Sequence, residues 1–200
     1  MLAPKFWYPE NNEISFSSLA LVPFGHIYSL LSKLRMSKAV KKQFDIPIVC
    51  IGNLNAGGTG KTPTTISAAE FLKDRKYNVH IVSRGYGGTA MGPLSVNDKE
   101  HSADEVGDEA LMLSAFAPTW VATKRSDGIQ SAIKEGADII LLDDGFQDPS
   151  VYKDLSILTV NAKKGFGNNR CIPAGPLREK LSSGLERADV LISIGTETSQ

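Results

Sequence analysis

Cysteine and histidine are scarce in this chain, with only two and three among its 200 residues. Cys50 lies inside an apolar run and Cys171 follows an arginine, so neither belongs to the paired Cys or His spacing typical of a zinc site. Two cysteines also cannot supply the disulfide framework of a small secreted domain. We therefore expect a reducing, cytosolic setting.

Long apolar runs and an excess of charge of one sign are missing too. No stretch reaches the roughly 18 apolar residues of a membrane-spanning helix, and the N-terminus lacks the basic-then-apolar order of a signal peptide. Lys and Arg (22) balance Asp and Glu (22), so nothing marks a general nucleic-acid binder, and none is expected as a partner. What remains is a globular chain that is long enough to bury a substantial core.

From residue 46 onward, short β-branched runs alternate with helical stretches. We expect strands at 46–52, 78–84, 119–123, 138–144, 154–160 and 188–195, and helices at 62–75, 104–116 and 128–136. Such alternation predicts an α/β fold in which a mainly parallel sheet is covered by helices on both faces. The glycine-rich stretch 85–102 is long for a connection, which favours a functional flap.

Residues 1–44 differ from this core, which we place at 45–200. Five apolar residues recur at helical spacing between 24 and 34, and predict an amphipathic helix: Phe24, Ile27, Leu30, Leu31 and Leu34. The region is also basic, with Lys33, Arg35, Lys38, Lys41 and Lys42 in or after the helix. Two interpretations stay open. The helix packs on the protein's own core, or it lies on a membrane whose anionic lipids attract the cations.

Residues 55–63 read NAGGTGKTP and stand between a predicted strand and a predicted helix. A P-loop needs a glycine-rich turn whose N–H groups surround phosphate, a lysine for the β and γ phosphates, and a hydroxyl for Mg²⁺. The strict pattern has glycine where Asn55 stands, but asparagine tolerates positive φ, so the turn can form. The sequence thus predicts a nucleotide-binding segment rather than a purely structural turn: Asn55, Ala56, Gly57, Gly58, Thr59, Gly60, Lys61 and Thr62.

The apolar segment DIILLDDGFQ ends in Asp143 and Asp144, the form of a Walker B element that holds Mg²⁺. Such a pair by itself often marks only a turn, but its place after a P-loop in a parallel sheet favours the metal. A second acidic group, in ADEVGDEALML, comprises Asp104, Glu105, Asp108 and Glu109. These carboxylates offset a helix dipole, or one of them is a general base; chemistry alone does not choose among them.

Three arginines stand near predicted strand ends, where they are either solvated or positioned to clamp phosphate: Arg84, Arg125 and Arg178. The guanine signature of a GTPase is not met, because Asp127 of TKRSD comes one residue late. The early second lysine of partition-type ATPases is absent as well, since Ala56 stands there. Phosphotransfer to a small molecule is the class that remains.

Several blocks together resemble the tetraacyldisaccharide 4'-kinases of lipid A biosynthesis: APKFWY, VCIGNLNAGGTGKTP, VSRGYGG, DEVGDEALML, LLDDGFQDP and IPAGPLREKLSSGLERAD. The resemblance implies Mg²⁺-dependent transfer of the γ-phosphate of ATP to the 4'-hydroxyl of a tetraacylated disaccharide 1-phosphate, which yields lipid IVA. It implies a peripheral enzyme on the anionic cytoplasmic face of the inner membrane, with no protein partner expected. It thereby favours the membrane interpretation of the N-terminal helix.

The resemblance also implies roles for individual residues. Lys61 and Thr62 would hold phosphate and Mg²⁺, Asp143 and Asp144 would form the Walker B site, and Asp108 would be the catalytic base. Arg84, Arg125, Gln147 and Arg178 match further family positions, which we assign to the nucleotide. Glu179 matches one that we assign to the metal.

Two departures from the family accompany these roles. Many members carry histidine where this chain has Asp148. Members also continue into a second, smaller C-terminal lobe with a histidine that pairs with the catalytic aspartate. We expect that lobe to be missing here, with no substitute among His26, His80 and His101.

The alternative function is an ATP-dependent switch or partner-binding module that phosphorylates no lipid.

Overall fold

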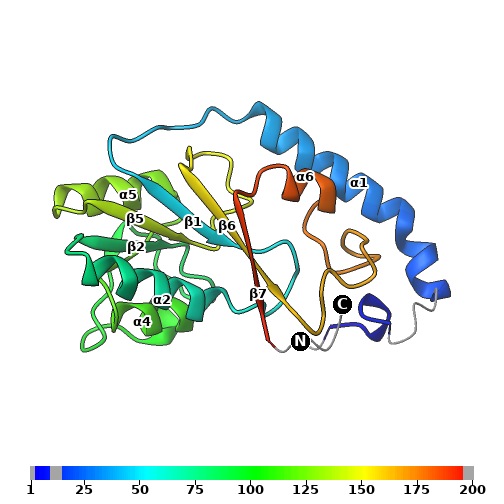
Figure 1. The fold of residues 1–200 in the computed structure, drawn as a ribbon, viewed down its shortest axis with the longest axis horizontal. Coiled ribbons are helices and arrows are strands. Elements are labelled where there is room, and N and C mark those ends of the chain that lie inside the picture. The colour runs from blue at the N-terminus through cyan, green and yellow to red at the C-terminus, as the bar shows by residue number, and fades with distance from the viewer. Residues whose placement is uncertain (1–2, 10–14, 196–200) are drawn as a thin grey trace. The chain divides into compact units, whose positions relative to one another are not determined.

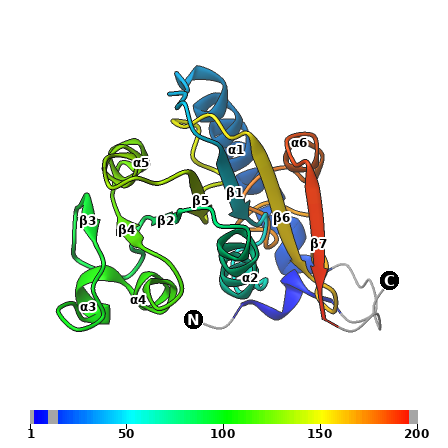
Figure 2. The same cartoon turned by 60° about the vertical axis from the view of Figure 1, so that its left-hand side comes forward.

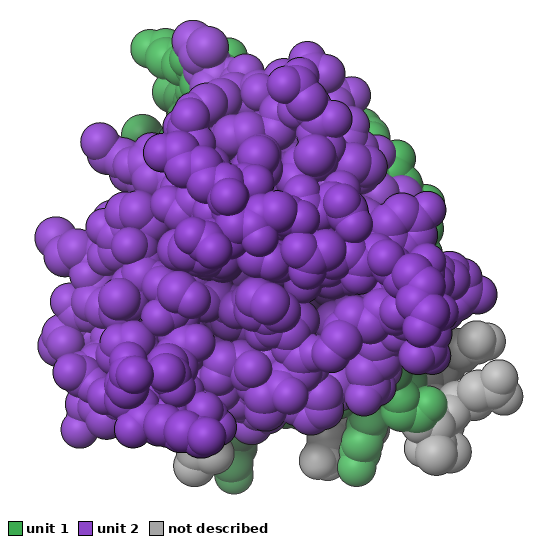
Figure 3. All heavy atoms as spheres, turned by 90° about the vertical axis from the view of Figure 1, so that its left-hand side faces the viewer, with its two compact units in different colours: residues 1–39, 53–60, 157–200 green, residues 40–52, 61–156 purple. Residues whose placement is uncertain are grey.

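The computed structural model describes residues 3–9 and 15–195. Within it the chain forms two compact units, each made of segments that are distant in sequence. The first comprises residues 1–39, 53–60 and 157–200, and the second comprises residues 40–52 and 61–156 (green and purple in Figure 3). The chain passes between them at the glycine-rich segment, because residue 60 ends one stretch of the first unit and Lys61 begins one of the second.

The second unit contains five strands in the order β3-β4-β2-β5-β1 (Figures 1 and 2). Strands β1 (Ile48–Gly52), β5 (Ile139–Asp143), β2 (Val79–Ser83) and β4 (Thr119–Val121) pair in parallel. The short β3 (Leu94–Ser95), within the stretch expected as a loop, pairs antiparallel with β4. The mainly parallel sheet is confirmed, and its parallel strands end along one edge, where Ile51 lies opposite Asp143.

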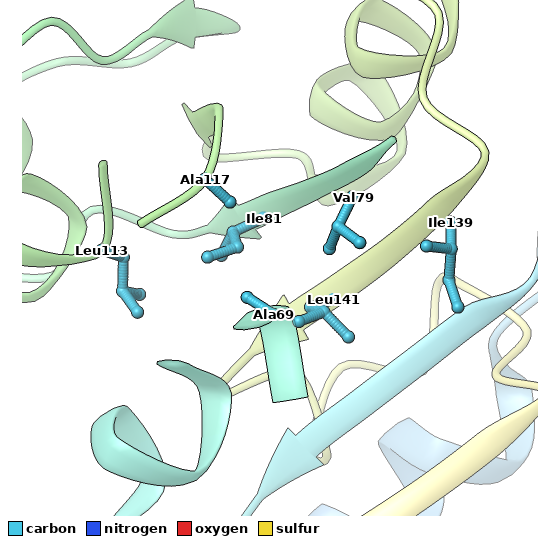
Figure 4. Packing of buried hydrophobic residues seen from close by; sticks show 7 residues of the cluster. All are labelled: Ala69, Val79, Ile81, Leu113, Ala117, Ile139 and Leu141. Atoms are coloured by element: carbon cyan, nitrogen blue, oxygen red, sulfur yellow. The ribbon is translucent and has the colours of Figure 1, made fainter. Parts of the chain in front are cut away.

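Helices cover both faces of these strands. Helix α5 (Arg125–Lys134) lies on one face, and α2 (Lys61–Asp74) and α4 (Asp108–Ser114) lie on the other (Figure 2). Because β2 and β5 are buried along their whole length, their sequences are continuous apolar runs instead of alternating ones. Apolar side chains from both strands pack with those of the second face (Figure 4): Ala69, Val79, Ile81, Leu113, Ala117, Ile139 and Leu141.

The single helix expected over 104–116 is wrong, because the chain forms α3 (Ala103–Val106) and α4 with a break at Gly107. Gly107 has φ of 87°, a conformation that favours glycine. A Cβ there would also lie 2.5 Å from the carbonyl oxygen of Tyr86. The break makes Asp108 the first residue of a new helix, while Glu105 closes a capping box with Ser102 on the preceding one.

The first unit contains the 3₁₀ turn η1 (Lys5–Trp7), the long helix α1 (Phe16–Lys38) and the short α6 (Leu181–Leu185). It also contains β7 (Val190–Ile194) and, from residue 157 onward, its parallel partner β6 (Leu155–Asn161). Helix α1 contacts the rest of this unit through small residues. Ser18 Oγ donates to the Ala174 carbonyl at 2.6 Å, and a Cβ on Gly25 would lie 2.9 Å from the Cys171 carbonyl oxygen. The face that packs is therefore small and polar.

The apolar stripe of α1 faces the opposite way. Its five side chains are 43 to 61 % exposed: Phe24, Ile27, Leu30, Leu31 and Leu34. The interpretation that this stripe packs into the protein's own core is thus wrong for the residues that the structure describes. The helix is also longer than expected, since it begins at Phe16 and continues through Pro23. None of the described helices is long and apolar enough to cross a bilayer.

Candidate nucleotide and metal site

The glycine-rich turn of the first unit is held from inside by two polar side chains. Asn53 Nδ2 donates to the Gly57 carbonyl at 3.1 Å and to Thr59 Oγ1 at 2.8 Å. Thr59 Oγ1 also lies 2.9 Å from Thr159 Oγ1 of β6. Gly57 and Gly60 have φ of 124° and 87°, so the turn needs glycine at both positions. A Cβ on Gly57 or Gly58 would meet no atom within 4 Å, which leaves room for a ligand against the backbone there.

Asn55 does not adopt the positive φ expected where it replaces the first glycine of the P-loop pattern. Among the described residues the non-glycine positions with positive φ are Lys76, Asp144 and Asn169, so Asn55 does not replace glycine by adopting that conformation. Its buried side-chain amide instead donates to the Gly165 carbonyl at 3.0 Å. Beside it, Ala56 N donates to Pro176 O and Arg178 N donates to Leu54 O, both at 2.7 Å. These bonds fasten the turn to the segment around residues 165–178.

In the second unit Lys61 begins α2 and is buried. Its Nζ lies 3.7 Å from Oδ1 of Asp144, the second aspartate of the DDGFQ segment. Thr62 follows it and is half-buried. The predicted P-loop lysine and the predicted Walker B pair, about 80 residues apart in sequence, are therefore neighbours.

Asp143 ends β5 and is only 1 % exposed. Its Oδ2 accepts a hydrogen bond from Ser83 Oγ at 3.3 Å, while its Oδ1 is buried without a hydrogen-bond partner among the described residues. Burial, together with the charges of Glu109 and Asp144, raises its pKa to about 6, against the lowering effects of Lys61 and Ser83. A buried carboxylate oxygen with no donor is suited to a cation.

Arg125 reaches the same turn from α5. It is 6 % exposed, and its Nη2 donates to the Asp144 carbonyl at 2.9 Å while its Nη1 pairs with Asp148 Oδ2 at 3.0 Å. Asp144 has φ of 49°, and its N–H donates to the Ile51 carbonyl at 3.0 Å. Arg125 therefore contacts the Walker B backbone, a role that residue type and strand position alone do not reveal.

Two contributors to this cluster were not singled out from the sequence. Ser83 ends β2, next to β5, and its position at a strand's carboxyl end was an available signal. Glu109 was one of four carboxylates left undecided, and its charge acts on Asp143. Asp108, the residue favoured by resemblance, is exposed at the first position of α4.

The remaining expected residues are distributed over both units. Arg84 is exposed after β2, and Gln147 is half-buried after the DDGF turn. In the first unit Arg178 is half-buried, and the buried carboxylate of Glu179 accepts a hydrogen bond from Arg187 Nη2. Glu179 is thus already engaged by a cation of its own unit.

A magnesium ion fits the second unit's carboxylates in the manner usual for nucleotide enzymes. No cluster of three or more His, Cys, Asp or Glu side chains in the described part of the chain could hold a metal by itself. Mg²⁺ is ordinarily bound by one or two carboxylates with phosphate oxygens and waters completing six ligands. Asp143 and Asp144, with the Thr62 hydroxyl, are the residues that would hold it.

Comparison with known proteins relates this arrangement to one family. The family model described as tetraacyldisaccharide-1-P 4'-kinase matches residues 17–200. A tetraacyldisaccharide 4'-kinase from Jannaschia sp. (strain CCS1) is 50 % identical over all 200 residues, and one from Dinoroseobacter shibae is 48 % identical. The chain covers 60 % and 59 % of these two relatives.

A solved structure gives the same relationship for the fold. LpxK from Aquifex aeolicus, in complex with ATP, superposes with a TM-score of 0.81 at 31 % sequence identity. The match covers 92 % of this chain and 60 % of the Aquifex chain. With a family model that spans nearly all of its residues, the chain belongs to the tetraacyldisaccharide-1-P 4'-kinase family.

Proposed function

We propose that this chain is the nucleotide-binding part of a kinase that transfers the γ-phosphate of ATP to the 4'-hydroxyl of a tetraacyldisaccharide 1-phosphate, with lipid IVA as the product. The observation that carries the proposal is the Lys61, Asp144 and Asp143 cluster, where a buried carboxylate oxygen lies beside a P-loop lysine. The family supports the acceptor, since its members are named for it. The chain spans about 60 % of its relatives' length, so the activity is proposed for the longer protein.

The roles follow from charge and position. Backbone N–H groups of residues 55–60 would surround the phosphates, and Lys61 would neutralise their β and γ oxygens. Mg²⁺ held by Thr62, Asp143 and Asp144 would neutralise charge that develops on the transferred phosphoryl group. Asp108, exposed at the start of α4, is free to accept the proton of the acceptor hydroxyl. Arg84, Gln147 and Arg178 are assigned to orienting the nucleotide directly, and Arg125 to orienting it through the Walker B backbone that it contacts.

The membrane contact is part of the same proposal. The exposed stripe of α1 is apolar, and its last turn and the residues after it are basic, through Arg35, Lys38, Lys41 and Lys42. An apolar face would enter the lipid boundary and cations would attract anionic headgroups, as in interfacial helices. This supports a peripheral position on the cytoplasmic face of the inner membrane, where the acceptor's acyl chains stay in the bilayer.

The test uses an extended protein, in which this chain continues into the C-terminal region of the Jannaschia relative. Incubation with γ-labelled ATP and tetraacyldisaccharide 1-phosphate should move the label to a lipid product on thin-layer chromatography. Lys61→Met in the extended protein is the matched control and should abolish the transfer. Label released only as free phosphate would support the alternative, an ATP-dependent switch, which the family does not favour.

A further inference from the structure

The side chain of Asp148 lies outside the predicted metal site and is held on both of its oxygens. Oδ2 accepts from Arg125 Nη1 at 3.0 Å, and Oδ1 accepts from Ser150 N at 2.9 Å and Ser150 Oγ at 2.6 Å. Burial raises the pKa of Asp148, but the Ser150 bonds and the Arg125 charge outweigh it and the pKa lies below its usual value. Asp148 is therefore a fixed anion.

Arg125 connects Asp148 to the Walker B turn (Asp143 and Asp144) by hydrogen bonds. The same guanidinium that pairs with Asp148 donates through Nη2 to the Asp144 carbonyl at 2.9 Å and, more weakly, to the Asp143 carbonyl at 3.5 Å. Its charge is buried, and the Asp148 carboxylate pairs with it at 3.0 Å. Without such a partner a buried guanidinium is costly and seeks solvent or another anion. The pair with Asp148 thus helps to orient the Arg125 guanidinium toward the Walker B turn.

The turn needs a restraint because Asp144 is in an unfavourable backbone conformation. Its φ of 49° is left-handed, a region that costs a non-glycine residue about 1 kcal/mol. Hydrogen bonds hold it on both sides, from its own N–H to Ile51 O and from Arg125 to its carbonyl. In this conformation the Asp144 carboxylate lies 3.7 Å from Lys61 Nζ.

We propose that Asp148 is a positioning residue for the phosphotransfer site: through Arg125 it holds the Asp143–Asp144 turn in the conformation that aligns both carboxylates with Lys61. In this role Asp148 acts through Arg125 and takes no direct part in the chemistry. The inference rests on the proposed function, because the aligned carboxylates matter only if they hold Mg²⁺ with ATP. Asp148 stands at the position where the family resemblance leads one to expect histidine.

The experiment compares Asp148→Asn and Asp148→Ala with Ser150→Ala, which removes one bond to Oδ1 but leaves the Arg125 pair intact. ATP binding to this chain is measured by calorimetry with Mg²⁺ and with EDTA. Loss of a side chain that orients metal ligands through hydrogen bonds weakens metal binding by about 10- to 100-fold, so both Asp148 variants should lose most of the Mg²⁺-dependent gain in ATP affinity. The ATP affinity of the Asp148 variants in EDTA should change little. The ATP affinity of Ser150→Ala should change little under either condition. Asp148→Asn keeps the side-chain shape, so the test stands if the alanine variant fails to fold.

Hydrogen exchange of residues 141–147 without nucleotide provides a second readout. The Asp144 amide, bonded to Ile51 O, should exchange faster in both Asp148 variants and not in Ser150→Ala. Unchanged exchange, or equal losses of ATP affinity with and without Mg²⁺, would overturn the inference. A wild-type chain that binds no ATP would instead overturn the proposed function, and the exchange data would then decide by themselves whether Asp148 holds the turn.

Discussion

The Ser83 hydroxyl donates to Oδ2 of Asp143 at 3.3 Å, while Oδ1 of the same carboxylate is buried without a hydrogen-bond partner in the described part of the chain. One oxygen is thus oriented by a neighbouring strand and the other is left for a ligand. The arrangement disfavours the charged carboxylate until a cation arrives, which is why the pKa of Asp143 is raised to about 6.

The raised pKa makes Asp143 a pH-dependent cost to stability in EDTA. The cost is absent below the unfolded-state pKa near 3.8, grows as pH rises toward about 6, and is complete above that value. Asp143→Asn should therefore stabilise the protein at pH 8 by on the order of 1 to 3 kcal/mol. Near pH 4 it should change little. Urea unfolding at the two pH values measures this; an equal effect at both would contradict the raised pKa.

Lys61→Met should weaken ATP binding by at least about tenfold, since an ammonium-phosphate contact is a charge-assisted bond worth roughly 1.5–3 kcal/mol. The fold should survive because methionine fills the same buried space. Lys73→Met on the same helix is the control, as its Nζ bonds to the Phe116 carbonyl in an exposed setting. Calorimetry in the presence of Mg²⁺ gives the affinities. Equal ATP affinity of the two variants would contradict the P-loop assignment.

Asp108 and Glu109, the first two residues of α4, should have different effects on the kinetics of the extended protein. Asp108→Asn should lower kcat by about 10² to 10⁴, the range for loss of a general base, with little change in ATP affinity. Glu109→Gln should instead alter the Mg²⁺ concentration needed for half-maximal rate, because its charge acts on Asp143. Initial rates over a Mg²⁺ series report both. A loss of ATP affinity in Asp108→Asn with kcat intact would make it a structural or metal-linked residue.

His80 is buried, and its Nδ1 accepts a hydrogen bond from Trp120 Nε1 at 3.1 Å. Burial lowers the pKa of His80 below 6.5, against the raising effects of Glu135 and Asp138. The folded state therefore resists protonation, and stability should fall as pH drops through 6.5 toward the lowered pKa. His80→Gln should flatten this dependence between pH 7 and 5, as followed by tryptophan fluorescence during urea unfolding. An unchanged slope would assign the acid sensitivity to other groups.

The exposed stripe of α1 should mediate binding to vesicles that contain anionic lipid. Leu30 and Leu31 are 59 % and 61 % exposed, so Leu30→Ser with Leu31→Ser should reduce cosedimentation without unfolding the chain. Phe71→Ser on α2 is the matched control, as Phe71 is 55 % exposed. Charge reversal at Lys33, Lys38 and Lys41 should reduce binding more at low salt than at high salt. If only the Phe71 variant loses binding, the membrane contact lies in the second unit.

Much of the core could be predicted from residue patterns because its determinants are local. The strands at 48–52, 79–83 and 139–143 are apolar runs of the right length, and the helix at 61–74 follows directly from the glycine-rich turn. Lys61 and the aspartates could be nominated because each stands at a strand end or a helix start, where parallel strands gather their ligands. Hydrophobic periodicity and turn-forming residues are patterns within about ten residues, so they can be recognised in the sequence.

The parts that only the tertiary structure decided depend on contacts between distant segments. Gly107 breaks the helix with a φ of 87°, at a place where Tyr86 O leaves no room for a side chain. Asn55 holds the glycine-rich turn through its hydrogen bond to Gly165 O, more than 100 residues away in sequence. The α1 stripe could be found by its spacing, but spacing does not say which face packs; Ser18 and Gly25 permit a close approach that larger side chains would prevent. Likewise the Arg125–Asp148 pair joins the start of a helix to a turn 23 residues later in the sequence. No local sequence pattern predicts that these two side chains are in contact.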